Sequence, residues 1–409
     1  MTPWPHWVAH PPDADHNHRV PTEPGSLREV TVFFLRLGTT AFGGPAAHIA
    51  IMRHEIVEQR GWIDDEEYAR LIGLANLVPG PNSTEVAMHV GRVRAGTKGL
   101  FAAGLAFIAP AFVMMLGLAW LYQEYGTRPR FQSVLAGIAP VVVVLIVQAI
   151  LQLGRSSLRA APTIAIGLVA LGAAVVGVHE LVILAVAGFT ALAVWRMGEG
   201  RPARGSGGLG VALLPALPAL HQLGALGPVL ATAGPVMLAP LFLVFLQIGA
   251  VLYGSGYVLY AFLESALVSN RHWLTHRQLL DAIAMGQLTP GPLFTTATFI
   301  GFTLRGFPGA VVATVGIFLP AFVFVAATDV VVRRLQHSAA FAAFLTGVVA
   351  ASLALMVAVA GILAREAFVD GWTVAVGAAV AAVLLWRRVN PVWCIAAGAL
   401  AGAVLPGLG

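Results

Sequence analysis

Long apolar stretches separated by short polar connections follow one another along nearly the whole chain. A first set of six covers roughly residues 30–52, 68–90, 99–122, 131–153, 162–178 and 181–195, and a second set of six covers roughly 238–268, 279–302, 309–332, 341–363, 372–386 and 392–405. The stretches are continuously apolar, which favours helices over the alternating strands, about 10 residues long, of a membrane β-barrel. The pattern predicts an all-α polytopic membrane protein.

The composition supports this prediction. Of 409 residues, 58% are hydrophobic and only 11% are charged, whereas a soluble domain carries about 25% charged residues. A single cysteine, Cys394, excludes an intramolecular disulfide and a cysteine-ligated metal cluster. We predict no cofactor and no metal site, and we interpret the net charge of +5 as a topology signal and not as a sign of nucleic-acid binding.

Two segments interrupt the apolar pattern and set the domain boundaries. Residues 1–26 hold four histidines and two aspartates; these side chains can bind a metal, but a disordered polar tail without a signal peptide is the simpler interpretation. Residues 198–210 are rich in glycine and basic, as linkers are, and the apolar segment 211–237 that follows is broken by four prolines. We therefore divide the chain into a tail (1–26), a first membrane repeat (27–197), a connection (198–237) and a second repeat (238–409).

The two repeats match residue by residue. One group of residues recurs 211 positions later: Phe34, Gly38, Gly43, Trp62, Leu77, Pro79, Gly80 and Pro81. A second group recurs 210 positions later: Gly91, Gly96, Gly99, Pro110 and Phe112. A duplicated membrane unit accounts for this register, and secondary transporters commonly contain such repeats.

The arginines predict that the two repeats face opposite sides of the membrane. The connection 92–98 holds three cations, whereas its counterpart in the second repeat holds only Arg305, and the next connection there carries Arg333 and Arg334. Under the positive-inside rule this change of bias requires an odd number of crossings between the repeats. Segment 211–237 is therefore predicted to span, which gives about 13 crossings in a six, one, six arrangement of inverted repeats.

The strongest candidate site is the Pro-Gly-Pro sequence of each repeat. Proline and glycine break a helix, and a broken helix at membrane depth is tolerated inside protein or beside a water-filled cavity. After the first break, residues 82–84 are suited to cap a new half-helix, whose free N–H groups attract an anion; after the second, Thr295 and Thr296 offer a weaker polar lining. The alternative is a pair of proline kinks that only pack helices.

The first helix of each repeat is the other paired feature. Gly43, Gly44 and Pro45 interrupt the first one, and Arg36 lies inside its apolar run, where an arginine costs about 2.5–3.5 kcal/mol and marks a functional site by default. Arg36 is predicted to contact an anion; the alternatives are a structural ion pair with Glu85 or a side chain that reaches the membrane surface.

Glu85 and His89 share one helical face and form a candidate proton relay, for which packing is the competing interpretation. The chain lacks the glycine-rich nucleotide-binding, zinc-protease and serine-hydrolase motifs, so an enzyme and an ATP-driven pump are both unsupported and no catalytic residue is predicted.

These motifs resemble those of the chromate ion transporter family. The resemblance rests on the sequence from Phe34 to Ile49, Gly61–Trp62, Leu77 to Glu85 and Pro110–Phe112 in the first repeat, and on their counterparts in the second. It implies the long, two-domain form of the family, an inner-membrane secondary transporter that exports chromate and confers resistance to it. Sulfate has the same charge and nearly the same size, so a sulfate or other oxyanion transporter in either direction remains an alternative, as does a membrane sensor or enzyme.

We expect an oxyanion to bind near the midplane while the two repeats rock around it, with protons as a candidate coupling ion, the lipid bilayer as surroundings and a homodimer left open. The candidate substrate-binding residues are Arg36, Phe42, Gly43, Gly44, Pro45, His48, Pro79, Gly80, Pro81, Asn82, Ser83, Thr84, Tyr253, Gly254, Pro290, Gly291, Pro292, Thr295 and Thr296, and the candidate coupling residues are Glu85 and His89.

Overall fold

A computed structural model describes residues 26–199, 236–254, 256–335, 338–386 and 389–404 of the protein. In these ranges the regular structure is helical, as the apolar pattern predicts. Five helical stretches there are long and apolar enough to cross a membrane: Asn82–Tyr125, Pro129–Ser157, Glu180–Met197, Leu293–Ala327 and Ala339–Ala367. The predicted tail, most of the linker and the predicted connecting span lie outside the described residues.

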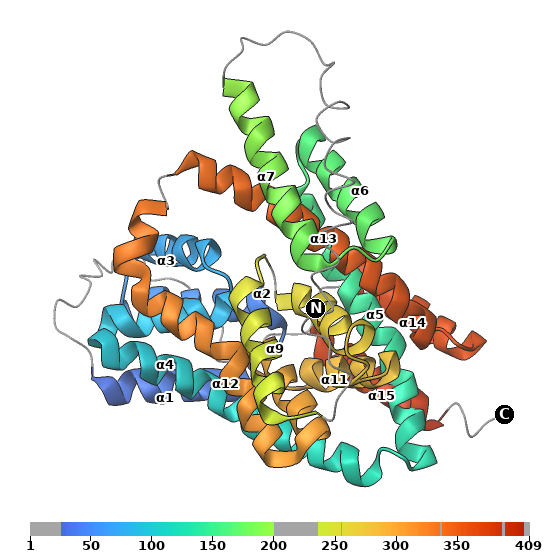
Figure 1. Cartoon of the computed structure of the whole chain (residues 1–409). Helices are drawn as coiled ribbons and strands as arrows, with labels where there is room; N and C mark the ends of the chain where they lie inside the picture. The colour runs from blue at the N-terminus through green and yellow to red at the C-terminus, as the bar shows by residue number, and fades with distance from the viewer. Residues whose placement is uncertain (1–25, 200–235, 255, 336–337, 387–388, 405–409) are drawn as a thin grey trace.

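The helices of the two halves follow the same order (Figure 1). The first half contains α1 (Leu27–Thr40), α2 (Gly44–Arg53), the π-helix η2 (His54–Gln59), α3 (Asp65–Leu77), α4 (Asn82–Tyr125), α5 (Pro129–Ser157), α6 (Ala161–Val175) and α7 (Glu180–Glu199). The second contains α9 (Leu238–Val251), η4 (Gly256–Val258), α10 (Leu259–Leu263), the π-helix η5 (Glu264–Ser269), α11 (His276–Leu288), η6 (Leu293–Thr295), α12 (Thr296–Leu335), α13 (Ala339–Ala367), α14 (Gly371–Trp386) and α15 (Pro391–Val404).

Backbone breaks recur at matching positions of the two halves. Gly43 and Gly254 adopt left-handed φ values of 107° and 106° at the breaks after α1 and α9. Gly96 and Gly306 adopt φ values of 64° and 63° at chain reversals inside α4 and α12. Glycine adopts this left-handed backbone without the steric cost that a Cβ atom brings, which explains its place at these reversals.

The first apolar stretch doubles back on itself. After the break at residues 41–43, α2 and η2 return along α1, so that Trp62 lies beside the start of α1. There its indole Nε1 donates a hydrogen bond to Glu29 (3.2 Å) and its ring packs against Phe33. The prediction that residues 30–52 cross the bilayer once is therefore corrected: α1 and α2 form a hairpin.

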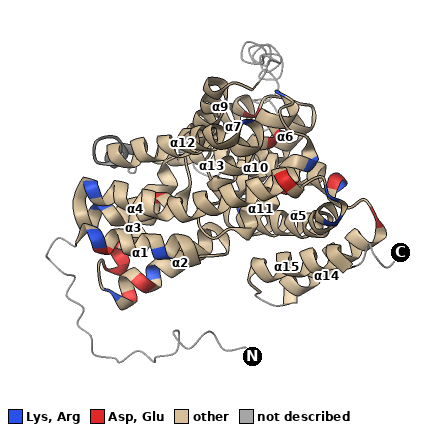
Figure 2. Cartoon of the chain, turned by 90° about the horizontal axis from the view of Figure 1, so that it is seen from below, with Lys and Arg blue, Asp and Glu red and all other residues tan. Residues whose placement is uncertain are grey.

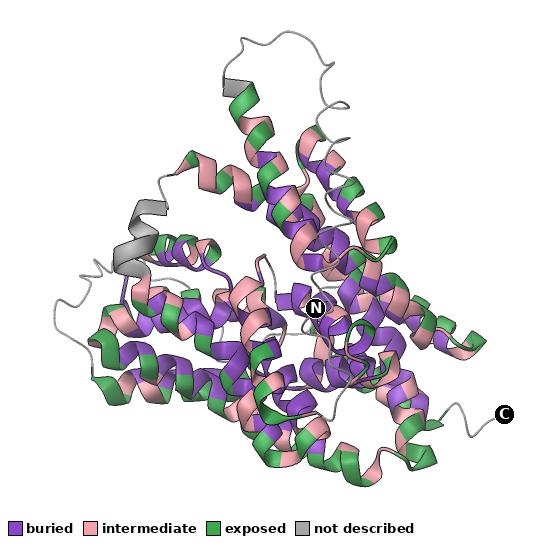
Figure 3. Cartoon of the chain, viewed as in Figure 1, coloured by how far each residue is buried: buried purple, intermediate pink, exposed green. Residues whose placement is uncertain are grey.

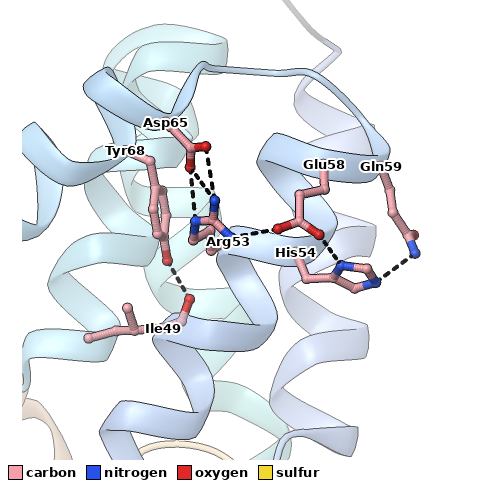
Figure 4. Close-up of polar contacts among 7 residues, drawn as sticks. All are labelled: Ile49, Arg53, His54, Glu58, Gln59, Asp65 and Tyr68. Carbon is pink, nitrogen blue, oxygen red and sulfur yellow. Dashed lines mark hydrogen bonds and ion pairs between the residues drawn. The ribbon is translucent and has the colours of Figure 1, made fainter. Parts of the chain in front are cut away.

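The second apolar stretch is also a hairpin. At the start of α3, Asp65 accepts a hydrogen bond from Arg53 (2.9 Å), and Tyr68 donates one to the Ile49 carbonyl (2.7 Å; Figure 4). The first part of α4 then runs back toward the start of α1, where Arg94 Nη2 lies 3.5 Å from Glu29 Oε2. The predicted crossing over residues 68–90 is thus also corrected. We call the end of the molecule that holds Glu29, Trp62 and Arg94 the Glu29 face.

The second part of α4 runs from the Glu29 face to the opposite end of the molecule. Gly91 and Gly99 pack backbone to backbone where the helix reverses. At the far end, Tyr122 donates a hydrogen bond to Asp281 of α11 (2.9 Å), and Gln123 donates one to the Phe302 carbonyl of α12 (3.2 Å). We call this end the Asp281 face. The hairpin of α11 and the first part of α12 therefore opens toward the Asp281 face.

The second part of α12 makes the reciprocal path. It starts at the reversal around Gly306 and reaches Arg92 of the first half, whose guanidinium donates a hydrogen bond to the Val325 carbonyl (2.9 Å). The hairpins of the two halves thus enter from opposite ends of the molecule, and α4 and α12 connect the two ends.

The remaining helices pack across the two halves. Gly137 of α5 lies against Gly398 and Gly402 of α15, and Gly188 of α7 lies against Phe344 of α13. Figure 3 shows buried residues lining the interior of the bundle and exposed residues along its outer surface. Charged residues gather mainly near helix ends, with a dense group beside α1, α2 and α3 (Figure 2).

Candidate functional site

Four chain breaks meet in the interior of the molecule, and they include both Pro-Gly-Pro sequences. We call them the central loops: residues 41–43, 78–81, 252–254 and 289–292. The Gly80 amide donates a hydrogen bond to the Leu252 carbonyl (2.9 Å), and the Gly291 amide donates one to the Ala41 carbonyl (3.0 Å). Each Pro-Gly-Pro loop is therefore bonded to the first break of the other half.

The two central glycines leave little room for a side chain. Gly80 and Gly291 have φ values of 148° and 94°. A Cβ atom on Gly80 would displace the Glu85 carboxylate and lie 3.3 Å from the Cβ atom of Ala321 in α12. One on Gly291 would lie 3.0 Å from the Cβ atom of Ala111 in α4. Both the backbone conformation and the close approach of the two halves thus require glycine here.

His48 of α2 joins the central loop at residues 41–43 to the start of α4. Its Nε2 lies 3.1 Å from the Ala41 carbonyl oxygen, and its Nδ1 lies 3.3 Å from the Ser83 hydroxyl. A carbonyl oxygen only accepts, so Nε2 carries the proton, and in the neutral ring Nδ1 accepts a hydrogen bond from Ser83. The side chain is fully buried and holds α2 against the start of α4.

Asn82 connects the start of α4 to the second half. Its amide Nδ2 donates to Asn76 Oδ1 (2.7 Å) and, at 3.4 Å, to the Gly254 carbonyl. The Tyr253 hydroxyl lies 3.5 Å from the Leu77 carbonyl at the end of α3. Asn76 is exposed and Asn82 is half-buried, so the described residues do not fully cover this polar corner of the site.

The start of α4 offers unused backbone donors. The N-cap is Pro81, which corrects the prediction that residues 82–84 cap the half-helix; Asn82 is its first residue. The amides of Thr84 and Glu85 both donate to the Pro81 carbonyl (2.7 and 3.1 Å). In the described part of the chain, the amides of Asn82 and Ser83 have no hydrogen-bond acceptor, as is usual for the first turn of a helix. They can donate to an anion.

Thr84 and Glu85 are buried without hydrogen-bond partners among the described residues. Both residues are fully buried, and neither the Thr84 hydroxyl nor either Glu85 carboxylate oxygen is bonded there. Buried polar side chains are normally hydrogen-bonded, so this pair is a candidate ligand site.

The equivalent place in the second half is closed. The hydroxyls of Thr295 and Thr296 donate to the carbonyls of Pro292 (2.7 Å) and Leu293 (2.8 Å). Leu293 and Phe294 are buried there, and Gln287, which corresponds to Asn76, donates a hydrogen bond to Tyr260 (3.1 Å). The predicted asymmetry between the two Pro-Gly-Pro loops therefore extends to their hydrogen bonds and their exposure.

Arg36 lies on the exposed face of α1 together with Thr39 and Thr40. The Thr40 hydroxyl donates to the Arg36 carbonyl (2.8 Å), so the hydroxyl is used within the helix. Glu85 is buried and has no described partner, which rules out the alternative of an Arg36–Glu85 ion pair in this conformation. His89 lies one turn beyond Glu85 and is also buried.

The remaining candidates lie in or beside the central loops. Phe42 and Gly43 are half-buried, and Pro79, Pro81, Pro290 and Pro292 are buried. A Cβ atom on Gly44 would lie 3.1 Å from the Tyr257 hydroxyl, and Pro45 packs against Gly256. Tyr257, Asn76, Ala41 and Leu252 were missed because their roles depend on loop geometry; only the polar pair Asn76 and Asn82, flanking the prolines, gave a sequence signal.

The acidic run after Trp62 has a structural role. Asp64 caps α3 by accepting a hydrogen bond from the Glu67 amide (2.7 Å), and Asp65 binds Arg53. Glu58 binds both Arg53 and His54 (Figure 4). These contacts hold the two hairpins together at the Glu29 face, away from the central loops.

Broken helices that meet inside a bundle of apolar helices define a polytopic membrane protein with an interior polar site. A sequence model of chromate transporters matches residues 28–193 and again residues 239–403. The chain belongs to the chromate transporter family. This membership points to a membrane transporter of chromate and not to an enzyme.

Individual relatives agree with the family assignment. The chain is 32% identical over 362 residues to the chromate transport protein of Cupriavidus metallidurans, with 88% of both chains covered. It is 30% identical to a probable chromate transport protein of Synechococcus elongatus, covering 86% of this chain and 88% of the relative. It is 32% identical to the chromate transport protein of Pseudomonas aeruginosa, covering 74% and 72% of the two chains. No solved structure matches the chain.

Proposed function

We propose that the protein is a secondary-active transporter that exports chromate across the inner membrane and thereby gives resistance to it. The family supports chromate as the cargo. The observation that carries the proposal is the reciprocal pair of hydrogen bonds that joins each Pro-Gly-Pro loop to the first break of the other half. Such a crossing of broken helices at mid-depth is the arrangement in which secondary transporters bind their substrates.

We propose that the two halves are inverted repeats and that transport occurs when they rock about the central loops. The directions of the hairpins support this proposal. Those of the first half enter from the Glu29 face, and the hairpin of α11 and α12 enters from the Asp281 face. Because re-entrant hairpins do not cross the bilayer, we expect fewer crossings than the 13 counted from hydropathy. The cation-rich connection 92–98 lies at the Glu29 face, so we place this face in the cytoplasm.

The oxyanion is proposed to bind at the start of α4. The unused amides of Asn82 and Ser83 supply donors, the helix N-terminus supplies partial positive charge, and the Asn82 side chain closes the polar corner toward Gly254. Chromate and sulfate present the same charge and similar oxygen atoms to these donors. Sulfate is therefore the competing cargo.

The test is uptake of labelled chromate into everted membrane vesicles under an imposed membrane potential. We expect wild-type protein to accumulate chromate and Asn82→Leu, which installs the residue of the closed second-half site, to reduce accumulation at least tenfold. Asn270→Leu makes the same change at an exposed position away from the central loops and should transport normally.

Competition by excess sulfate ranks the two cargoes in the same assay. If folded wild-type protein accumulates no chromate at either polarity of the potential, export of chromate is refuted. Normal transport by Asn82→Leu would instead remove the start of α4 from the binding site.

A further inference from the structure

The unpartnered carboxyl group of Glu85 lies within the first turn and a half of the helix that we propose as the anion site. The two halves differ sharply at this position. Thr296, which replaces Glu85 in the second half, satisfies its hydroxyl within its own helix, whereas the described residues offer Glu85 no hydrogen bond and no ion pair. The neighbouring Thr84 hydroxyl is unpartnered too, while its counterpart Thr295 is bonded.

The surroundings of Glu85 provide little to balance a negative charge. The segments of α4 and α12 that pack here, residues 99–119 and 313–327, contain no ionisable side chain. The titratable groups near it are His48 of α2, engaged by Ala41 and Ser83, Tyr253 of the central loops, and His89 on its own helix. α1 carries two cations: Arg28 is exposed at its start, beside Glu29, and Arg36 lies on the exposed face of the helix. A bare carboxylate in such a place is strongly unfavourable, and protonation removes the charge.

The charge of Glu85 and an anion at the start of α4 compete for the same helix N-terminus. The carboxyl group lies one turn from the amides of Asn82 and Ser83, so a carboxylate repels a dianion bound there, whereas a neutral carboxyl group does not. By linkage, a proton on Glu85 strengthens anion binding, and a bound anion strengthens proton binding to the same extent.

Resting on the proposed function, we propose that Glu85 is a proton-coupling site: it takes one proton from water as the oxyanion binds and returns it to water on the other side as the oxyanion leaves. The transported unit is then a dianion with one proton and carries a net charge of −1. The membrane potential, negative inside, still drives its export.

The test measures protons and charges moved per chromate in proteoliposomes, at alkaline pH where free chromate is a dianion. We expect wild-type protein to move one proton with each chromate. A pH-sensitive dye inside the proteoliposomes reports the proton movement. Glu85→Gln mimics the neutral carboxyl group and should move chromate without protons. Its reversal potential should therefore correspond to two charges moved per chromate, whereas that of the wild type should correspond to one. Glu264→Gln, at a buried acid paired with His276 and Ser269, should behave as wild type.

Binding provides a second readout if the Glu85→Gln protein binds chromate but does not cycle. Chromate affinity of the wild type should fall up to about tenfold per pH unit above the pH at which Glu85 loses its proton, and that of Glu85→Gln should stay constant. Chromate transport by wild-type protein without proton movement, proton movement that survives in Glu85→Gln, or a requirement for sodium in place of protons would each overturn the proposal. Absence of any chromate transport would instead refute the proposed function.

Discussion

At the scale of single residues, we expect Thr84 to contribute to transport and Thr295 to contribute to stability. They occupy equivalent positions, but only Thr295 has a hydrogen bond for its hydroxyl in the described structure. Thr295→Val should cost about 0.5–1.5 kcal/mol in the free energy of unfolding because it removes that bond. Thr84→Val removes an unpartnered buried hydroxyl and should leave stability unchanged or raise it, while lowering chromate transport.

For Thr84→Val and Thr295→Val, thermal unfolding in detergent measures stability, and uptake into vesicles measures chromate transport. Equal loss of stability in both would mean that Thr84 has a partner in the folded protein. Unchanged transport by Thr84→Val would remove its hydroxyl from the anion site.

The sequence predicted the two helix breaks at the Pro-Gly-Pro sequences but not the contacts that these breaks make. Prolines and glycines located both breaks because their effect on helices is local. The contact between Asn82 and Asn76 spans a loop, and the bond from Gly80 to Leu252 joins the two halves. Neither follows from propensity, because both depend on how the chain turns between residues 78 and 81.

At the scale of helices, the reversals inside α4 and α12 depend on backbone contact between glycines. A Cβ atom on Gly91 would collide with the Gly99 carbonyl oxygen, and the same holds for Gly301 and Gly309 in the second half. Gly91→Ala should therefore separate the two parts of α4 and destabilise the protein by about 1–3 kcal/mol, the usual cost of overpacking.

Gly117→Ala is the matched control, because a Cβ atom there meets no other atom within 4 Å. It should be neutral or slightly stabilising, as alanine favours a helix over glycine. Both variants are compared by chemical or thermal unfolding in detergent. If Gly91→Ala is as stable as Gly117→Ala, the backbones at Gly91 and Gly99 are not in close contact.

The hydropathy pattern does not predict the direction in which each helix runs. That pattern reports length and apolarity, and residues 30–52 have enough of both for one crossing. The hairpin instead follows from contacts that lie far apart in sequence, between Glu29 and the residues Trp62 and Arg94. The two hairpins of the first half remove two crossings together, so the sides of all later connections stay as the arginine bias predicts them.

At the scale of the whole molecule, the hairpins predict which residues share a side of the membrane. Arg28 and Gln59 are exposed at the Glu29 face, on either side of the first hairpin, and Glu124 is exposed at the far end of α4. In a background in which the single cysteine is replaced, Cys394→Ala, we expect Arg28→Cys and Gln59→Cys to react with a membrane-impermeant thiol reagent from one side and Glu124→Cys from the other. A single crossing between residues 30 and 52 would place Arg28 and Gln59 on opposite sides. Labelling of intact cells and everted vesicles therefore distinguishes the hairpin from a simple span, because only the hairpin returns the chain to the Glu29 face before α3 begins.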